Sequence, residues 1–154
     1  MKQRTIARTI EIVGIGLHKG VPVKMKLEPL DSDMGIIFYR VDAGVTIPLK
    51  KEFVVDTKMA TVIGKDGVVV STIEHLLSAV YAYGIDNLRI VIDNDEVPVL
   101  DGSSAGYCML IEEAGIKELE KSKKAIKIKK MVEVTTPDGK RVCLKPSNRI
   151  VYDF

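Results

Sequence analysis

The sequence predicts an α+β domain, in which two helices cover one face of a mostly antiparallel sheet. Short segments with β-branched residues in near-alternation fill most of the first hundred positions. Two segments of helical character, 72–83 and about 104–114, stand between strands, and each is followed by a glycine, Gly84 and Gly115. A chain of 154 residues can also bury a core without disulfides or a structural metal.

The strands are expected in a simple order along the chain. Asp66-Gly67 is a strong type I′ turn signal and predicts a hairpin from the apolar runs on either side of it. The expected strands are 5–13, 21–27, 35–40, 45–49, 53–56, 58–63, 68–71 and 87–93.

The chain changes character after the second helix. KELEKSKKA at 117–125 breaks the apolar pattern and predicts a linker after a first domain at 1–116. Beyond it, the PDGK turn predicts a hairpin between 126–136 and 141–146. No helix follows, and an unpaired strand at a chain end is an exposed edge. We therefore expect 126–154 to be the first strands of a truncated second α+β domain.

The composition argues against several functional classes. The net charge of +2, with both signs interspersed, gives no general attraction to nucleic acid or membrane. Five Tyr and three Phe form no basic–aromatic stripe, which disfavours an RNA-binding module. No signal peptide and no membrane span is expected. Cys108 and Cys143 are too few and too far apart for a disulfide scaffold, which favours reduced thiols in the cytoplasm.

STIEHLL, residues 71–77, sets Glu74 beside His75 and supports two interpretations. In the structural one, Ser71 and Glu74 form an S-x-x-E capping box and His75 merely occupies the first turn. In the functional one, the helix N-terminus favours the neutral imidazole that binds zinc and keeps Glu74 ionised as a base. A catalytic zinc needs three protein ligands, and His18 is the only other histidine, so the chain by itself completes no standard zinc site.

Three longer motifs resemble one known family. GIGLHKG (14–20), STIEHLLSAVYAYGIDN (71–87) and EVPVLDGSSAGY (96–107) are similar to stretches of the UDP-3-O-acyl-N-acetylglucosamine deacetylases, the zinc enzymes of lipid A biosynthesis in Gram-negative bacteria. The opening KQRTI and the phrase EFVVDTKMAT also resemble that family. The resemblance covers essentially the whole chain in the right order. It implies a two-domain enzyme with its active site between the domains.

The resemblance also implies roles for single residues. His75 matches a zinc ligand, and Glu74 matches the general base that activates water for attack on the N-acetyl group. His18 matches a position near the site that contributes to substrate binding or site structure. Thr57, Met59 and Ala60 align with residues that line the acetyl pocket, although the family usually has a different side chain at the position of Ala60.

The remaining Zn²⁺ ligands, the histidine that protonates the leaving amine and the acyl-chain passage are expected beyond residue 154. The expected partners are therefore an acylated UDP-amino sugar and a C-terminal domain of the same protein. One carboxylate cannot both cap its helix and act as the base, so Glu74 is expected to point away from Ser71. The isolated chain is expected to have little or no activity. A non-catalytic binding domain of the same fold is the alternative.

Overall fold

The computed structural model describes residues 1–153 and divides into two compact units, Met1–Lys123 and Lys124–Phe154. The first unit contains the sheets and helices that position the candidate site, and the second contains a single hairpin within its described residues.

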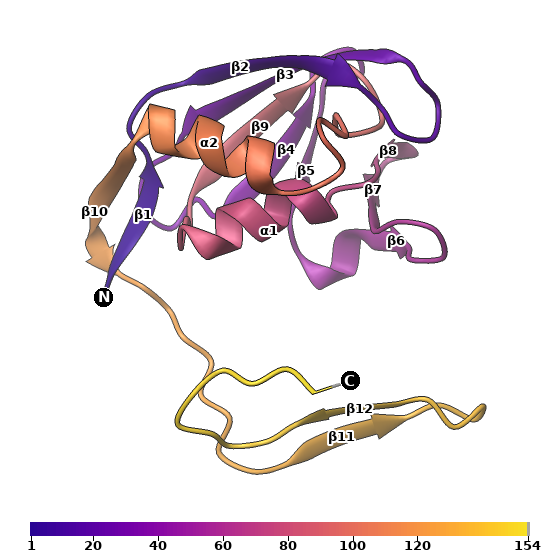
Figure 1. Ribbon diagram of the computed structural model, residues 1–154, viewed down its shortest axis with the longest axis vertical. Helices are drawn as coiled ribbons and strands as arrows, with labels where there is room; N and C mark the ends of the chain where they lie inside the picture. The colour runs from indigo at the N-terminus through magenta and orange to yellow at the C-terminus, as the bar shows by residue number, and fades with distance from the viewer. Residues whose placement is uncertain (154) are drawn as a thin grey trace. The chain divides into compact units, whose positions relative to one another are not determined.

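The main sheet of the first unit has five strands in the described residues. Its order is β2 (Ile10–Ile15), β3 (Pro22–Pro29), β9 (Leu88–Ile92), β4 (Ile36–Arg40) and β5 (Val45–Pro48). All neighbours are antiparallel except β4 and β9, which run parallel. Helices α1 (Glu74–Ala82) and α2 (Ala105–Ala114) contact each other and lie on one face of this sheet, as Figure 1 shows. The predicted α+β class is confirmed.

The core lies between the sheet and the two helices, and strand alternation explains how it forms. Along β3, Met25 and Leu27 are fully buried whereas Lys24 and Lys26 are exposed. The helices add Leu76 from α1 and, from α2, Tyr107 and Ile111. Among the described residues, no helix is long and apolar enough to cross a bilayer.

A smaller three-stranded sheet precedes α1. It consists of β6 (Val54–Asp56), β7 (Val62–Lys65) and β8 (Val68–Val70), and a single 3₁₀ turn at Lys51–Phe53 leads into it. Asp66 and Gly67 connect β7 to β8 with φ values of 52° and 78°. A type I′ turn requires positive φ at both of its central residues, so the turn predicted from the sequence is confirmed.

Two expectations about strand limits and the linker are wrong. The expected strand at 5–13 is two strands, because the chain bends after Ile6 so that β1 (Lys2–Ile6) and β2 belong to different sheets. Most of the expected linker at 117–125 is strand β10 (Ile116–Ser122), which pairs antiparallel with β1. Backbone pairing and cross-strand charges hold this polar strand, as in the Arg4–Glu118 ion pair at 3.5 Å.

The second unit contains β11 (Val132–Thr135) and β12 (Arg141–Leu144), an antiparallel pair around the predicted turn. The strands are shorter than the expected 126–136 and 141–146. Val132 pairs with Leu144 and Val134 with Val142, and these four apolar side chains are 48–71% exposed. No strand residue of this hairpin is buried within the described part of the chain. Whether it begins a second α+β domain stays a prediction.

Candidate active site

The segment before α1 is held by the chain that follows β9. Ser71 forms an isolated parallel bridge with Glu96, and its backbone N–H and its hydroxyl both donate to the carbonyl oxygen of Asp95, at 2.8 and 3.1 Å. The helix begins at Glu74 with Ile73 in the cap position and no side-chain cap hydrogen bond. The capping-box interpretation of Ser71 and Glu74 is therefore wrong, because Ser71 is committed elsewhere.

Glu74 instead faces the β6–β7 loop, residues 57–61. Its carboxylate accepts a hydrogen bond from the backbone N–H of Thr61. Burial by itself raises the pKa of Glu74, but the hydrogen bonds from Thr61 outweigh it, with a smaller electrostatic contribution from the neighbouring His75, and the pKa lies below the ordinary 4.5. Glu74 is therefore ionised at neutral pH, as a general base must be.

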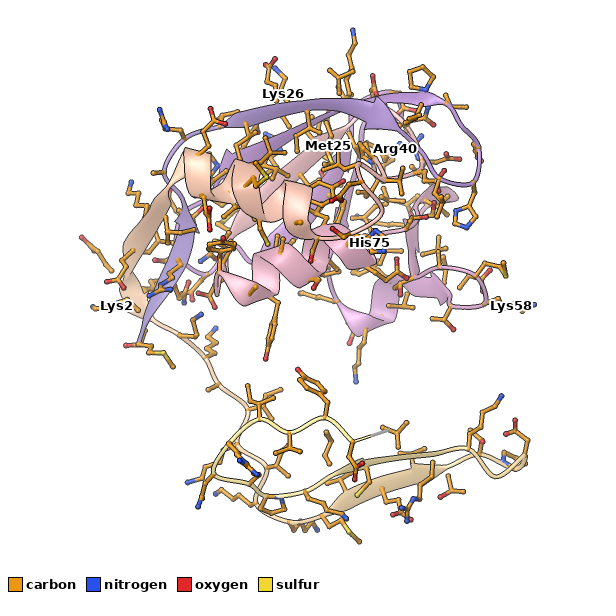
Figure 2. The ribbon with its side chains drawn as sticks, in the orientation of Figure 1. Lys2, Met25, Lys26, Arg40, Lys58 and His75 are labelled. Atoms are coloured by element: carbon orange, nitrogen blue, oxygen red, sulfur yellow. The ribbon has the colours of Figure 1, made fainter. Side chains whose placement is uncertain are left out.

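His75 is half-buried at the start of α1, where Figure 2 labels it. Its Nδ1 atom is buried and has no hydrogen-bond partner among residues 1–153. A buried ring nitrogen without a partner is unusual, since native structures pair almost all such groups.

The metal-binding side chains of this site fit zinc only in part. A histidine ligand must offer an unprotonated ring nitrogen, and the unpartnered Nδ1 atom makes His75 suitable as one ligand. No group of three or more His, Cys, Asp or Glu side chains within the described residues could hold a metal ion. A catalytic zinc takes three protein ligands, so the others would have to come from outside these residues.

The three residues expected to line the acetyl pocket lie on the β6–β7 loop. Thr57 and Met59 are exposed, Met59 at 86%, and Ala60 is half-buried. Lys58, at the tip of this loop, extends away from the body of the unit in Figure 2. The hydrogen bond from Thr61 to Glu74 brings this loop to the start of α1. Thr61 was not predicted, because a backbone donor leaves no signal in a side-chain motif.

His18 lies in the loop after β2 and contacts a buried carboxylate that was not predicted, Glu96. The Nδ1 atom of His18 lies 2.7 Å from Oε1 of Glu96, and the side chain of Glu96 is only 3% exposed. Thr72 donates its hydroxyl to the same oxygen at 3.0 Å. Within residues 1–153, the side-chain contacts of His18 go to Glu96 and Thr72, which connect it to the segment that leads into α1, and not to Glu74 or His75.

This arrangement combines an ionised carboxylate, an imidazole with a free ring nitrogen and a loop of expected substrate contacts at the start of one helix. Such a set is typical of a metal-assisted hydrolase. The family model for the UDP-3-O-acyl N-acetylglycosamine deacetylases matches residues 3–154, and the chain belongs to this family.

Curated relatives agree over the whole chain. It is 90% identical to the UDP-3-O-acyl-N-acetylglucosamine deacetylase of Aliarcobacter butzleri (strain RM4018), with all 154 residues matched. It is 66% identical to the protein of the same name in Nautilia profundicola and 60% identical to that of Helicobacter pylori (strain J99), again over the full chain. The chain spans about half the length of these relatives, 51% of the first and 52% of the other two.

Proposed function

We propose that this chain is the N-terminal part of a zinc-dependent cytoplasmic deacetylase of lipid A biosynthesis, which hydrolyses the N-acetyl group of UDP-3-O-acyl-N-acetylglucosamine to acetate and a free 2-amine. The observation that carries the proposal is the pair at the start of α1: an ionised Glu74 beside His75, whose buried Nδ1 is unpartnered. Family membership and the names of the relatives support the same substrate.

In the proposed reaction, Glu74 accepts a proton from the water that attacks the acetamide carbonyl carbon. The carbon–nitrogen bond then breaks, acetate takes the water oxygen, and the amine leaves with a proton supplied by a group outside this chain. Thr61 keeps the Glu74 carboxylate turned toward the β6–β7 loop. Zinc, when bound, supplies Lewis-acid polarisation of the carbonyl and lowers the pKa of water. His75 would be one of its ligands.

Substrate contacts are proposed for the surfaces around this pair. Thr57, Met59 and Ala60 would line the acetyl pocket, since their loop is joined to Glu74 through Thr61. His18 would contact the sugar or shape the site.

We further propose that the hairpin of β11 and β12 begins a second α+β domain that supplies the other ligands, because its valine and leucine face is exposed and the relatives are about twice as long. Both cysteines are free thiols, which suits a reducing cytoplasm.

The test is acetate release from UDP-3-O-acyl-N-acetylglucosamine by the full-length protein that contains this segment. Glu74→Gln is expected to lower kcat about 100-fold or more, the usual contribution of a general base, with little change in KM. Glu11→Gln is the matched control, because Glu11 is an exposed carboxylate that pairs with Lys26 on the main sheet. Full activity in Glu74→Gln would exclude Glu74 as the base.

A further inference from the structure

Glu96 is a buried carboxylate to which the proposed reaction gives no task. The residue is 2% exposed and lies between β9 and α2. Two isolated β-bridges hold its segment, one between Glu96 and Ser71 and the other between Pro98 and Gly16. The carboxylate therefore sits where the loop after β2 and the segment before α1 come together, although these lie far apart in the sequence.

Hydrogen-bond donors from both segments converge on Glu96. The backbone N–H of His18 lies 3.0 Å from Oε1 and 3.2 Å from Oε2, and the backbone N–H of Lys19 lies 3.3 Å from Oε2. The Nδ1 atom of His18 and the hydroxyl of Thr72 complete the set on Oε1. Burial alone would raise the pKa of Glu96, but these donors outweigh it and lower the pKa. They therefore stabilise an anion at this position.

The surrounding backbone is shaped to admit this carboxylate. A Cβ atom on Gly16 would lie 2.9 Å from Cδ of Glu96 and closer still to Oε2, so only glycine fits there without a shift. Thr72 has a φ of 56°, a left-handed conformation that is a genuine outlier for a β-branched residue. Such strain persists only where neighbouring contacts enforce it, and here the hydroxyl of Thr72 is bound to Glu96.

We propose that Glu96 is the positioning residue for His18 and, through Thr72, for the start of α1; the kinetic part of this inference rests on the proposed deacetylase function. Because the carboxylate accepts from Nδ1–H, it fixes one tautomer of His18 and leaves Nε2 as the ring nitrogen available to substrate. The side chain of His18 is 40% exposed, so a ligand can reach it. A carboxylate behind a histidine commonly fixes the tautomer and orientation of the ring in this way.

The tautomer of His18 can be measured without an activity assay. The chain has two histidines, so ¹H–¹⁵N correlation spectra of its imidazoles contain two ring systems, and His18→Ala identifies one of them. At about pH 8.5, where ordinary imidazoles are neutral, we expect His18 to carry its proton on Nδ1. Glu96→Gln should lose this tautomer preference, because the new amide N–H₂ is itself a donor and replaces a carboxylate oxygen that accepted hydrogen bonds. Glu11→Gln should keep the preference. A wild-type ring protonated on Nε2 overturns the proposal, even if Glu96→Gln fails to fold.

A kinetic cycle in the full-length protein tests the coupling. Glu96→Gln is expected to lower kcat/KM about 10- to 100-fold, the usual effect of losing a partner that orients a functional histidine. Because Glu96 acts in part through His18, the loss in the double variant with His18→Ala should be smaller than the sum of the two single free-energy losses. Fully additive losses overturn the proposal. If the unmodified full-length protein releases no acetate, the deacetylase function fails, and the tautomer measurement still decides the role of Glu96.

Discussion

Thr61 donates its backbone N–H to the carboxylate of Glu74, and this hydrogen bond joins the β6–β7 loop to the first residue of α1. A carboxylate at a helix start usually serves its own helix, by capping or by charge–dipole interaction. Here it accepts instead from Thr61 of the β6–β7 loop, which lies 13 residues before Glu74 in the sequence. The loop expected to contact substrate and the proposed base are thus held at a fixed distance from each other.

His75→Ala in the full-length protein should lower zinc affinity by more than about 100-fold, since losing a ligand costs more than losing a group that only orients one. Zinc content after dialysis against a chelator measures this. His18→Ala is the control, because it makes the same side-chain change at a histidine that is not proposed as a zinc ligand. Equal zinc retention in the two variants would remove His75 from the ligand set.

The 154-residue chain alone should release acetate at least about 1,000-fold more slowly than the full-length protein. Its described residues contain no group of three metal-binding side chains, and a catalytic zinc needs three protein ligands. Parallel assays at equal concentration make the comparison, with added zinc in both. Turnover close to that of the full-length protein would show that the chain carries a complete site.

Gly16→Ala should destabilise the first unit by about 1–3 kcal/mol, the usual cost of overpacking a closed site. The added methyl would meet the carboxylate of Glu96, whose position is fixed by several donors. Urea unfolding followed by circular dichroism measures the loss. Ser78→Ala, at an exposed position of α1, should stay within about 0.5 kcal/mol of the wild type. Equal stability of both variants would mean that the loop after β2 can move to accommodate the added methyl group at no cost.

Acid should weaken the fold partly through Glu96. The pKa of Glu96 in the folded state is below 4.5, so the unfolded state binds a proton first as the pH falls. The stabilisation by this carboxylate is therefore fully present above about pH 4.5 and is lost as the pH falls through the folded pKa. Urea unfolding between pH 7 and pH 3 should show a steeper loss for the wild type than for Glu96→Gln. Parallel curves would contradict this contribution.

Amide hydrogen exchange should distinguish the two units. The central strands β3 and β9 are flanked on both sides and bury Met25, Leu27 and Ile90, so their amides should exchange slowly. The β11–β12 hairpin has only exposed or half-buried residues, and an isolated hairpin is marginally stable in water. Its amides should exchange orders of magnitude faster in this chain. Comparable protection in β11 and β3 would mean that the hairpin is stabilised by contacts with other residues.

Local sequence signals predicted much of the fold because each element follows a local rule. Gly84 and Gly115, with φ values of 62° and 73°, do follow the two helices, and the Asp66-Gly67 turn has its expected geometry. Strand β10 escaped prediction because KELEKS has no apolar alternation, and its pairing with β1 depends on residues more than a hundred positions away.

The candidate site was predictable only in part, for a related reason. The Glu74–His75 pair stands out as a motif, and its two interpretations could be separated only once Ser71 was located against Asp95. Glu96 follows other acidic residues in DNDE, and nothing local distinguishes it from Asp95. Its partners, His18 and Thr72, lie 78 and 24 positions away. Convergence of distant donors on one carboxylate is a property of the folded chain.

The position of β9 between β3 and β4 also constrains how the chain is assembled during synthesis. Strands β3 and β4 are neighbours in sequence, yet in the finished sheet they never pair, because each bonds to a side of β9. Until residue 92 has left the ribosome, β3 and β4 each have an unpaired edge. A premature hairpin between these two edges would leave no place for β9 in the sheet. The nascent chain must therefore keep these two edges apart until the middle strand arrives, and slow non-local pairing of this kind is where misfolding and aggregation compete.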